Sequence, residues 1–287
     1  MPESVQASPL ADGSFDGVAA TAEGPPLAFA SRTSHGVNTG QAWDLTTRTV
    51  LGPPIPDFPA ERAEWTFGVP AGSPIVAWTH RDRVHVHDLG TGHELVLDGQ
   101  PDLLGLAVHS GRAAVVAVFG PARDAEFVVW DAATGDRLAE FVLWLGHRTA
   151  IDRSLLHAVP ASGPFVALTG GADAVVLDVE RGGDIPITTP DGLIILQPDG
   201  NDLHVLGTDA VLTAPGPCGP ATAARTGRLL VAAVLRDDPS TVLAWASTAR
   251  APSHLLKVTA PVNDLALAPD GTLLTATDEG LFTSRLP

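Results

Sequence analysis

The residues best suited to bind a metal ion lie together in the segment HRDRVHVHD at positions 80–88. His85 and His87 alternate along a predicted β-strand, so both side chains point to one face, and His80 can approach them across a hairpin. Three imidazoles in that arrangement could hold Zn²⁺. However, no carboxylate is identified that would orient these imidazoles, and His87 is equally suited to pack between two sheets. We therefore favour the packing interpretation and expect no metal or other cofactor.

The remaining reactive residues do not form a known catalytic pattern. Cys218, within PGPCGP, is the only cysteine, so no internal disulfide is possible and an inert thiol is expected. Asp202, Asp237 and Asp238 have no calcium-loop spacing, which favours solvated turn residues. The sequence contains no Gly-x-Ser-x-Gly, His-Glu-x-x-His, P-loop or Cys-x-x-Cys motif. We predict no catalytic residues and a protein that is not an enzyme.

Composition and charge narrow the class of partner. The 287 residues carry 33 acidic and 17 basic side chains, for a net charge of -16. Nucleic-acid binders normally show the opposite balance, so nucleic acid is not expected as a partner. The first residues lack the basic and apolar regions of a secretory signal, and no apolar stretch reaches the ~18 residues of a membrane span. These features predict a cytoplasmic protein that does not enter a membrane.

The elements that position these residues follow a repeat. Glycine-containing turns recur on average about every 41 residues, a spacing typical of four-stranded propeller units. Seven turns mark the repeat: Gly24, Gly72, Gly111, Gly163, Gly200, Gly227 and Gly271. Each is followed by a short run rich in Val, Leu and Ala, which predicts β-strands. The one segment with helical spacing is 147–159, where Ile151, Leu155 and Val159 recur every four residues.

A second repeated feature is a hydrophobic or aromatic residue followed by Asp. It occurs as Trp43-Asp44, His87-Asp88, Trp130-Asp131 and Leu177-Asp178. The Asp residues are 44, 43 and 47 positions apart. Together with Gly146-His147 and the final segment LALAPDGTLLTATDEGLFTSRL, this pattern resembles the WD-repeat (WD40) family. The composition, rich in Ala, Gly, Pro and Arg, favours a divergent bacterial member.

The resemblance implies an all-β, seven-bladed β-propeller that forms a single domain over residues 1–287. The last unit ends at its third strand, so we expect residues 1–10 to pair with it and to close the ring. The interval from Gly200 to Gly227 is only 27 residues, too short for four full strands. The fifth unit is therefore expected to lack a fourth strand, and six blades remain possible.

The family resemblance also implies a protein–protein interaction scaffold, as a monomer or as a subunit of a larger assembly. The loops between the second and third strands, and those between blades, are expected on one face, where arginine favours partner binding. The predicted partner-binding residues are Arg32, His35, Arg81, Arg83, Arg123, His147, Arg148, Arg153 and Arg236. The alternative is an enzyme or a small-ligand or metal-binding propeller that uses its central channel. A sugar-binding propeller is less favoured because the chain lacks Tyr.

Overall fold

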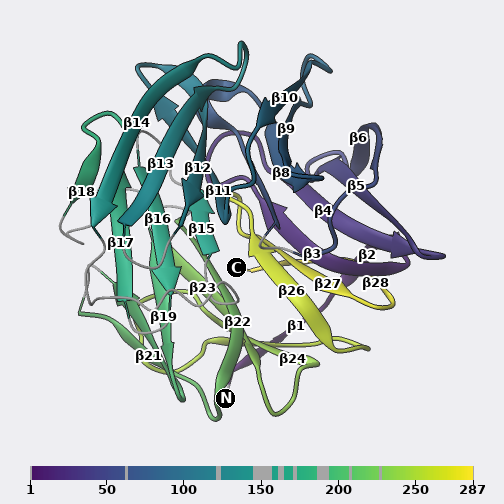
Figure 1. The fold of residues 1–287 in the computed structure, drawn as a ribbon. Helices are drawn as coiled ribbons and strands as arrows, with labels where there is room; N and C mark the ends of the chain where they lie inside the picture. Colours follow the sequence, from purple (N-terminus) through teal and green to yellow (C-terminus); the bar gives the residue numbers. More distant parts are fainter. Residues whose placement is uncertain are drawn as a thin grey trace. The chain divides into compact units, whose positions relative to one another are not determined.

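Short β-strands make up nearly all the regular structure of the computed structural model (Figure 1). It describes residues 2–61, 64–120, 124–144, 157–160, 165–170, 173–185, 194–206, 209–225 and 228–286. The described strands form seven sheets, which we number I to VII by the chain order of their consecutive strands. Residues 1–60 and 196–287 form one compact unit, unit 1, and residues 61–195 form another, unit 2. Each unit has its own hydrophobic cores.

Sheet I, in unit 1, shows the pattern of a regular repeat. Its four strands are antiparallel and adjacent in chain order. They are β3 (Ser14–Ala20), β4 (Leu27–Ser34), β5 (Val37–Asp44) and β6 (Thr49–Pro56). The burial falls from the first two strands to β6, which is largely exposed. The exposed strand explains why prolines are tolerated at positions 53, 54 and 56.

Unit 2 contains three further sheets of four antiparallel strands. Sheet II comprises β7 (Trp65–Gly68), β8 (Ile75–His80), β9 (Arg83–Asp88) and β10 (Glu94–Asp98). Sheet III comprises β11 (Leu103–His109), β12 (Arg112–Phe119), β13 (Asp124–Asp131) and β14 (Arg137–Trp144). Sheet IV comprises β15 (His157–Pro160), β16 (Phe165–Gly170), β17 (Asp173–Asp178) and β18 (Gly183–Ile185). A 3-10 turn, η2 (Pro70–Gly72), precedes β8.

The segment with helical spacing lies partly outside the described residues. Of positions 147–159, the structure describes only the last three, which belong to β15. Strand β15 pairs with β16 through four consecutive residues, so the end of this segment is extended. Tertiary pairing with a neighbouring strand therefore determines the local structure here, rather than the four-residue spacing.

The remaining three sheets belong to unit 1 and are less regular. Sheet V has three described strands, as the short interval predicted: β19 (Ile195–Asp199), β20 (Asp202–Leu206) and β21 (Val211–Thr213). Sheet VI contains β22 (Cys218–Arg225), β23 (Leu229–Leu235), β24 (Thr241–Trp245) and β25 (His254–Lys257). Sheet VII contains β26 (Val262–Leu267), β27 (Thr272–Thr277) and β28 (Gly280–Arg285).

The N-terminal segment adds a strand to each of the last two sheets. Strand β2 (Ser8–Asp12) pairs antiparallel with β28, so purple and yellow strands lie side by side in Figure 1. Strand β1 (Glu3–Val5) instead pairs parallel with β25, at the outer edge of sheet VI. The sequence reasoning assigned all of residues 1–10 to the last unit and did not foresee the pairing of β1.

Both faces of β12, the second strand of sheet III, are buried, because each faces a neighbouring sheet. In β12, Ala114, Val116 and Val118 pack in a core that includes sheet IV residues. The alternate residues Val115 and Ala117 pack in a core that includes sheet II. This alternation is the two-residue period of a β-strand, and small Val and Ala side chains allow sheets to approach on both sides. In unit 1, one core joins sheets VI and VII, and another joins sheets VII and I.

Four Asp residues at the ends of third strands close the turn into the fourth strand. In each, one carboxylate oxygen accepts hydrogen bonds from the backbone N–H groups two and three residues later. The four residues are Asp44, Asp88, Asp131 and Asp178, with donor–acceptor distances of 2.7–3.2 Å. Asp favours such turns because its short side chain reaches the backbone that follows. The repeated Asp is therefore a local structural element of sheets I to IV.

Candidate functional site

The two described partner-binding predictions of unit 2, Arg81 and Arg83, lie at an exposed hairpin between β8 and β9. Arg81 and Asp82 form its tip, with φ values of 49° and 63°. Two successive left-handed residues are typical of the tight turns that match the twist of paired strands. Arg83 follows, with its side chain 60% exposed and its Nε 3.8 Å from the carboxylate of Asp98, which is 95% exposed. Such an exposed ion pair is weak, so Arg81 and Arg83 can reach a partner at little cost.

The predicted partner-binding residues of unit 1 differ in how firmly their side chains are held. His35 lies exposed at the tip of the hairpin between β4 and β5, with a φ of 52°. Arg32 is held within the unit: its guanidinium lies 5.8 Å from the centre of the Phe15 ring and packs closely on Gly13. Arg236 is exposed, but one of its Nη atoms donates to the carbonyl of Cys218 at 3.3 Å. Four other predicted residues, Arg123, His147, Arg148 and Arg153, lie outside the described residues.

Carboxylates share the hairpin turns of unit 1 with these basic residues. Asp278, in the turn before β28, accepts hydrogen bonds from Ser14 Oγ at 3.2 Å and Asn263 Nδ2 at 2.9 Å, and so links sheets VII and I. Asp238, in the turn before β24, accepts a 2.6 Å hydrogen bond from Lys257 Nζ. That bond, with those from Thr241 and Ser240, holds the pKa of Asp238 well below its ordinary range. From the sequence, Asp238 was expected only as a solvated turn residue, and Asp278 was not singled out.

Two of the three candidate zinc ligands of sheet II, His80 and His85, pack against neighbouring rings. His85 stacks on Trp78, with ring centres 5.1 Å apart, and meets the edge of the His80 ring at 5.9 Å. Its Nδ1 lies 3.6 Å from a carboxylate oxygen of Glu94. Within the described part of the chain, no group of three or more His, Cys, Asp or Glu residues could hold a metal ion. His80 and His85 thus pack against each other at half-buried positions of β8 and β9. The packing of His87 between two sheets stays a prediction.

Cys218 and the acidic residues near it have structural contacts of their own. Cys218 is 2% exposed. Burial raises the pKa of its thiol, Arg236 lowers it, and Asp202 raises it further. A buried, protonated thiol is a poor nucleophile. The carboxylate of Asp202 accepts a 2.6 Å hydrogen bond from Thr213 Oγ1, so it is engaged within sheet V.

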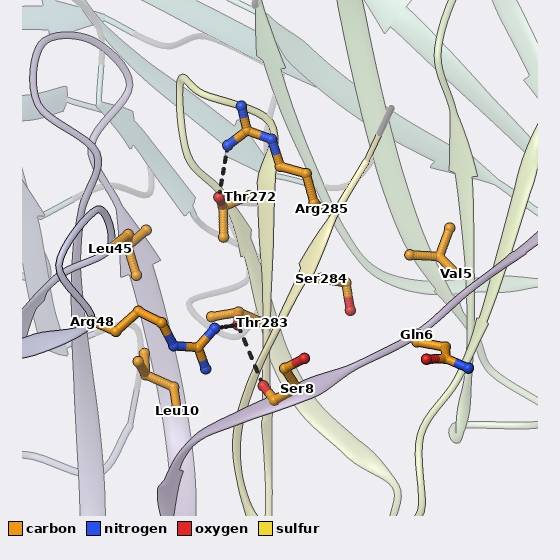
Figure 2. Close-up of a pocket in the computed structure, with 10 residues that line it drawn as sticks. All are labelled: Val5, Gln6, Ser8, Leu10, Leu45, Arg48, Thr272, Thr283, Ser284 and Arg285. Atoms are coloured by element: carbon orange, nitrogen blue, oxygen red, sulfur yellow. Dashed lines mark hydrogen bonds between the residues drawn. The ribbon is translucent and has the colours of Figure 1, made fainter.

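A pocket of about 330 Å³ lies in unit 1, beside the turn closed by Asp44. It is bounded by the N-terminal segment, by the turn between β5 and β6, and by strands β27 and β28 (Figure 2). Its lining residues are Val5, Gln6, Ser8, Leu10, Leu45, Arg48, Thr272, Thr283, Ser284 and Arg285. The lining therefore combines two arginines, four hydroxyl groups, one amide and three aliphatic side chains, and contains no carboxylate.

Hydrogen bonds fix both arginines of this pocket. Arg48 donates from one Nη to Thr283 Oγ1 at 3.2 Å and from the other to the carbonyl of Pro9 at 2.6 Å. Arg285 donates to Thr272 Oγ1 at 3.3 Å and forms an ion pair with Asp270. In Figure 2 the two guanidinium groups lie toward different ends of the pocket. The sequence reasoning did not identify this pocket.

A comparison of equivalent turns gives the signal that could have identified Arg48. The fourth residue after each turn-closing Asp has a positive φ in all four turns. It is Gly92, Gly135 and Gly182 in sheets II to IV, but Arg48 in sheet I, where φ is 58°. Positive φ is unfavourable for a residue with a Cβ atom. An arginine at a glycine position of the repeat is therefore unusual and directs attention to its side chain.

Known structures share this fold. A crystal structure of RRP9 WD40 repeats matches with 94% of each chain covered, 14% identity and a TM-score of 0.63. A structure of U3-55K matches with 96% of each chain covered, 14% identity and a TM-score of 0.64. The computationally designed Ika8 protein matches with 96% of each chain covered, 16% identity and a TM-score of 0.55.

These likenesses show that the chain has the fold of WD40-repeat structures, as the sequence pattern predicted. No family model and no curated protein matches the sequence. Among the described residues, no helix is long and apolar enough to span a membrane.

Proposed function

We propose that this chain is a non-catalytic scaffold that binds a protein partner through the turns between the second and third strands of its sheets. In this proposal it is a seven-bladed propeller formed by one domain over residues 1–287, with one blade for each sheet. Strand β2 closes the ring by completing sheet VII through its pairing with β28. The seven sheets of the described residues and the likeness to WD40-repeat structures support this arrangement.

The observation that carries the proposal is the exposed hairpin at Arg81 and Arg83. The tight turn fixes the backbone, while both side chains extend from it without a strong internal partner among the described residues. Arginines on a rigid support are favourable contact residues, because little conformational freedom is lost on binding. At the other described hairpin of this kind, exposed His35 stands beside Val37, which is 53% exposed and offers an apolar contact.

The alternative of an enzyme or a metal-binding propeller has less support. His85 of sheet II packs on Trp78 and His80, and Cys218 is buried. Arg32 is best regarded as a support for its hairpin, because its guanidinium packs on Phe15 and Gly13. The proposal therefore places the main contacts on His35, Arg81 and Arg83, and keeps Arg236 as a further contact.

The test compares two variants that change the net charge equally. The variant Arg81→Glu/Arg83→Glu alters the proposed contact turn. The control Arg137→Glu/Arg228→Glu alters two exposed arginines, one on β14 and one before β23. A protein captured from the source cells by the parent chain is identified, purified and titrated against all three chains.

We expect the first variant to weaken partner binding by about tenfold or more, and the control to bind like the parent. Equal binding by the two variants would show that the proposed turns are the wrong surface. Failure to capture any protein in stoichiometric amount would contradict the scaffold function itself.

A further inference from the structure

We propose that the pocket beside β2 and β28 binds a small organic oxyanion: a phosphate or carboxylate group attached to a short apolar body. The first observation is the charge of the lining. In a chain with a net charge of -16, this pocket has two arginines and no lining carboxylate. Asp270 neutralises Arg285 from outside the lining. No carboxylate among the described residues forms an ion pair with Arg48, so the pocket retains a positive charge.

The second observation is the backbone of Arg48. Three equivalent turns have glycine at this left-handed position, and only sheet I has a larger side chain there. Strained backbone conformations are retained where the side chain serves a purpose. Here the side chain enters the pocket, and its hydrogen bonds to Thr283 and to the Pro9 carbonyl hold the guanidinium in place (Figure 2). A fixed guanidinium is pre-organised to donate its remaining N–H groups to an anion.

The third observation is an unsatisfied hydroxyl. Ser284 is 4% exposed and lines the pocket, and its Oγ has no hydrogen-bond partner among the described residues. A buried hydroxyl without a partner is unfavourable. Figure 2 shows this hydroxyl directed toward the space between Thr283 and Gln6. An oxygen of a bound anion would accept the missing hydrogen bond.

The fourth observation limits the size and polarity of the ligand. The pocket volume of about 330 Å³ lies at the small end of the range for ligand sites. Leu10 and Leu45 on one side of the pocket and Val5 on the other supply aliphatic surface, which favours a ligand with an apolar part over a bare inorganic ion (Figure 2). Because Val5 and Leu10 belong to β1 and β2, a ligand here would also contact the N-terminal segment. The binding site and the proposed partner-binding turns involve different residues, so the two proposals fail independently.

The test measures binding of four probes to the full chain by calorimetry. The probes are phenyl phosphate, benzoate, inorganic phosphate and benzyl alcohol. We expect the two aromatic anions to bind more tightly than inorganic phosphate, and benzyl alcohol to bind weakest. Stronger binding of phenyl phosphate assigns a phosphate ligand, and stronger binding of benzoate assigns a carboxylate. Equal binding of charged and uncharged probes, or no binding in the millimolar range, would overturn the proposal.

Two substitutions separate binding from folding. Arg48→Gly introduces the residue that the other three turns carry, and it should weaken binding of the preferred anion by about tenfold. Ser284→Ala removes an unsatisfied hydroxyl, so it should leave stability unchanged or raised while weakening binding severalfold. Arg225→Gln, an exposed arginine of the same unit, is the matched control and should bind like the parent. If both pocket variants bind like this control, the assignment is wrong.

Discussion

Sheets I to IV and sheets V to VII differ in how their outer strands are held in place. Each of the first four is made from four consecutive strands, and an Asp closes its last turn through local hydrogen bonds. Among the described residues of the last three sheets no such Asp is found, and these sheets depend on contacts between distant segments. Strand β1 joins sheet VI and strand β2 joins sheet VII. The structure of sheets I to IV therefore depends on residues close together in sequence, whereas that of sheets V to VII depends on residues far apart in sequence.

Sheet V shows how a missing strand is compensated. Its edge strand β21 has no described fourth strand beside it. Instead, the backbone N–H of Thr213 donates to the carbonyl of Arg250 at 2.7 Å, and Arg250 Nε donates to Thr213 Oγ1 at 2.9 Å. Trp245 Nε1 donates to the same carbonyl at 3.2 Å. The loop after β24 therefore protects an edge that would otherwise expose backbone groups.

The largest effect is expected from removing the distant strands. Deletion of residues 2–12 exposes the edges of both β25 and β28 and removes the packing of Val5 and Leu10 on two cores. We expect the Tm to fall by about 10 °C, as measured by calorimetry. Deletion of residues 2–6 alone removes only the three paired residues of β1 and should have a smaller effect. An unchanged Tm for the longer deletion would refute the role of the N-terminal segment.

The second-largest effect is expected from replacing an Asp that closes a turn in sheets I to IV. Asp131 is 4% exposed, accepts two backbone hydrogen bonds and pairs with Arg112 at 3.3 Å. Asp131→Ala should lower the free energy of unfolding by about 2–3 kcal/mol. Asp44→Ala removes the two equivalent hydrogen bonds of a more exposed turn and should lower the free energy of unfolding by about 1 kcal/mol. Urea denaturation measures both, and equal losses would mean that burial does not set the strength of these turns.

A smaller effect is expected in sheet VI, where the hydroxyl of Ser253 takes the role that the Asp carboxylate has in sheets I to IV. In sheet VI, Ala246 follows Trp245 at the position of the repeated Asp. Its backbone N–H donates to Ser253 Oγ at 3.0 Å, and that hydroxyl donates to the carbonyl of Ala244 at 3.2 Å. Ser253→Ala should lower the free energy of unfolding by about 1 kcal/mol. Urea denaturation beside Thr248→Ala, an exposed residue of the same loop, tests this, and an equal loss in both variants would contradict it.

The smallest effect is a pH dependence at Asp238. Folding lowers the pKa of this carboxyl, so the stability it contributes is present above the ordinary Asp range and is lost as the pH falls toward the folded pKa. Asp238→Asn should therefore be slightly less stable than the parent at neutral pH. The difference should shrink in strongly acidic solution. Thermal denaturation across this pH range measures it, and a difference that grows with acidity would contradict the assignment.

The difference between local and distant contacts also explains which parts of the fold could be predicted from the sequence. Asp44, Asp88, Asp131 and Asp178 act locally, so their spacing correctly located four sheets. The interval after Gly200 likewise predicted that the fifth unit lacks a fourth strand, because 27 residues are too few for four full strands, and three strands of sheet V are described. The parallel pairing of β1 could not be predicted, since no local pattern of three residues determines which distant edge they meet.

The candidate site was less predictable from the sequence, because contacts in the folded chain determine which arginine side chains are held and which are exposed. The sequence placed Arg81 and Arg83 in an exposed hairpin, but it could not show that Arg32 packs on Phe15. The pocket joins residues near positions 5–10, 45–48 and 272–285, which only the folded chain brings together. Its one sequence signal is Arg48 at a position where the equivalent turns have glycine.

Hydrogen exchange of the chain with and without its captured partner tests the scaffold proposal most directly. The turns before and after the third strand lie at opposite ends of that strand, so protection identifies which end binds. We predict slower exchange in the hairpins at 35–36 and 81–82, and no change in the Asp turns at 45–47 and 89–92. Protection confined to the Asp turns, or absent from both ends, would contradict the account.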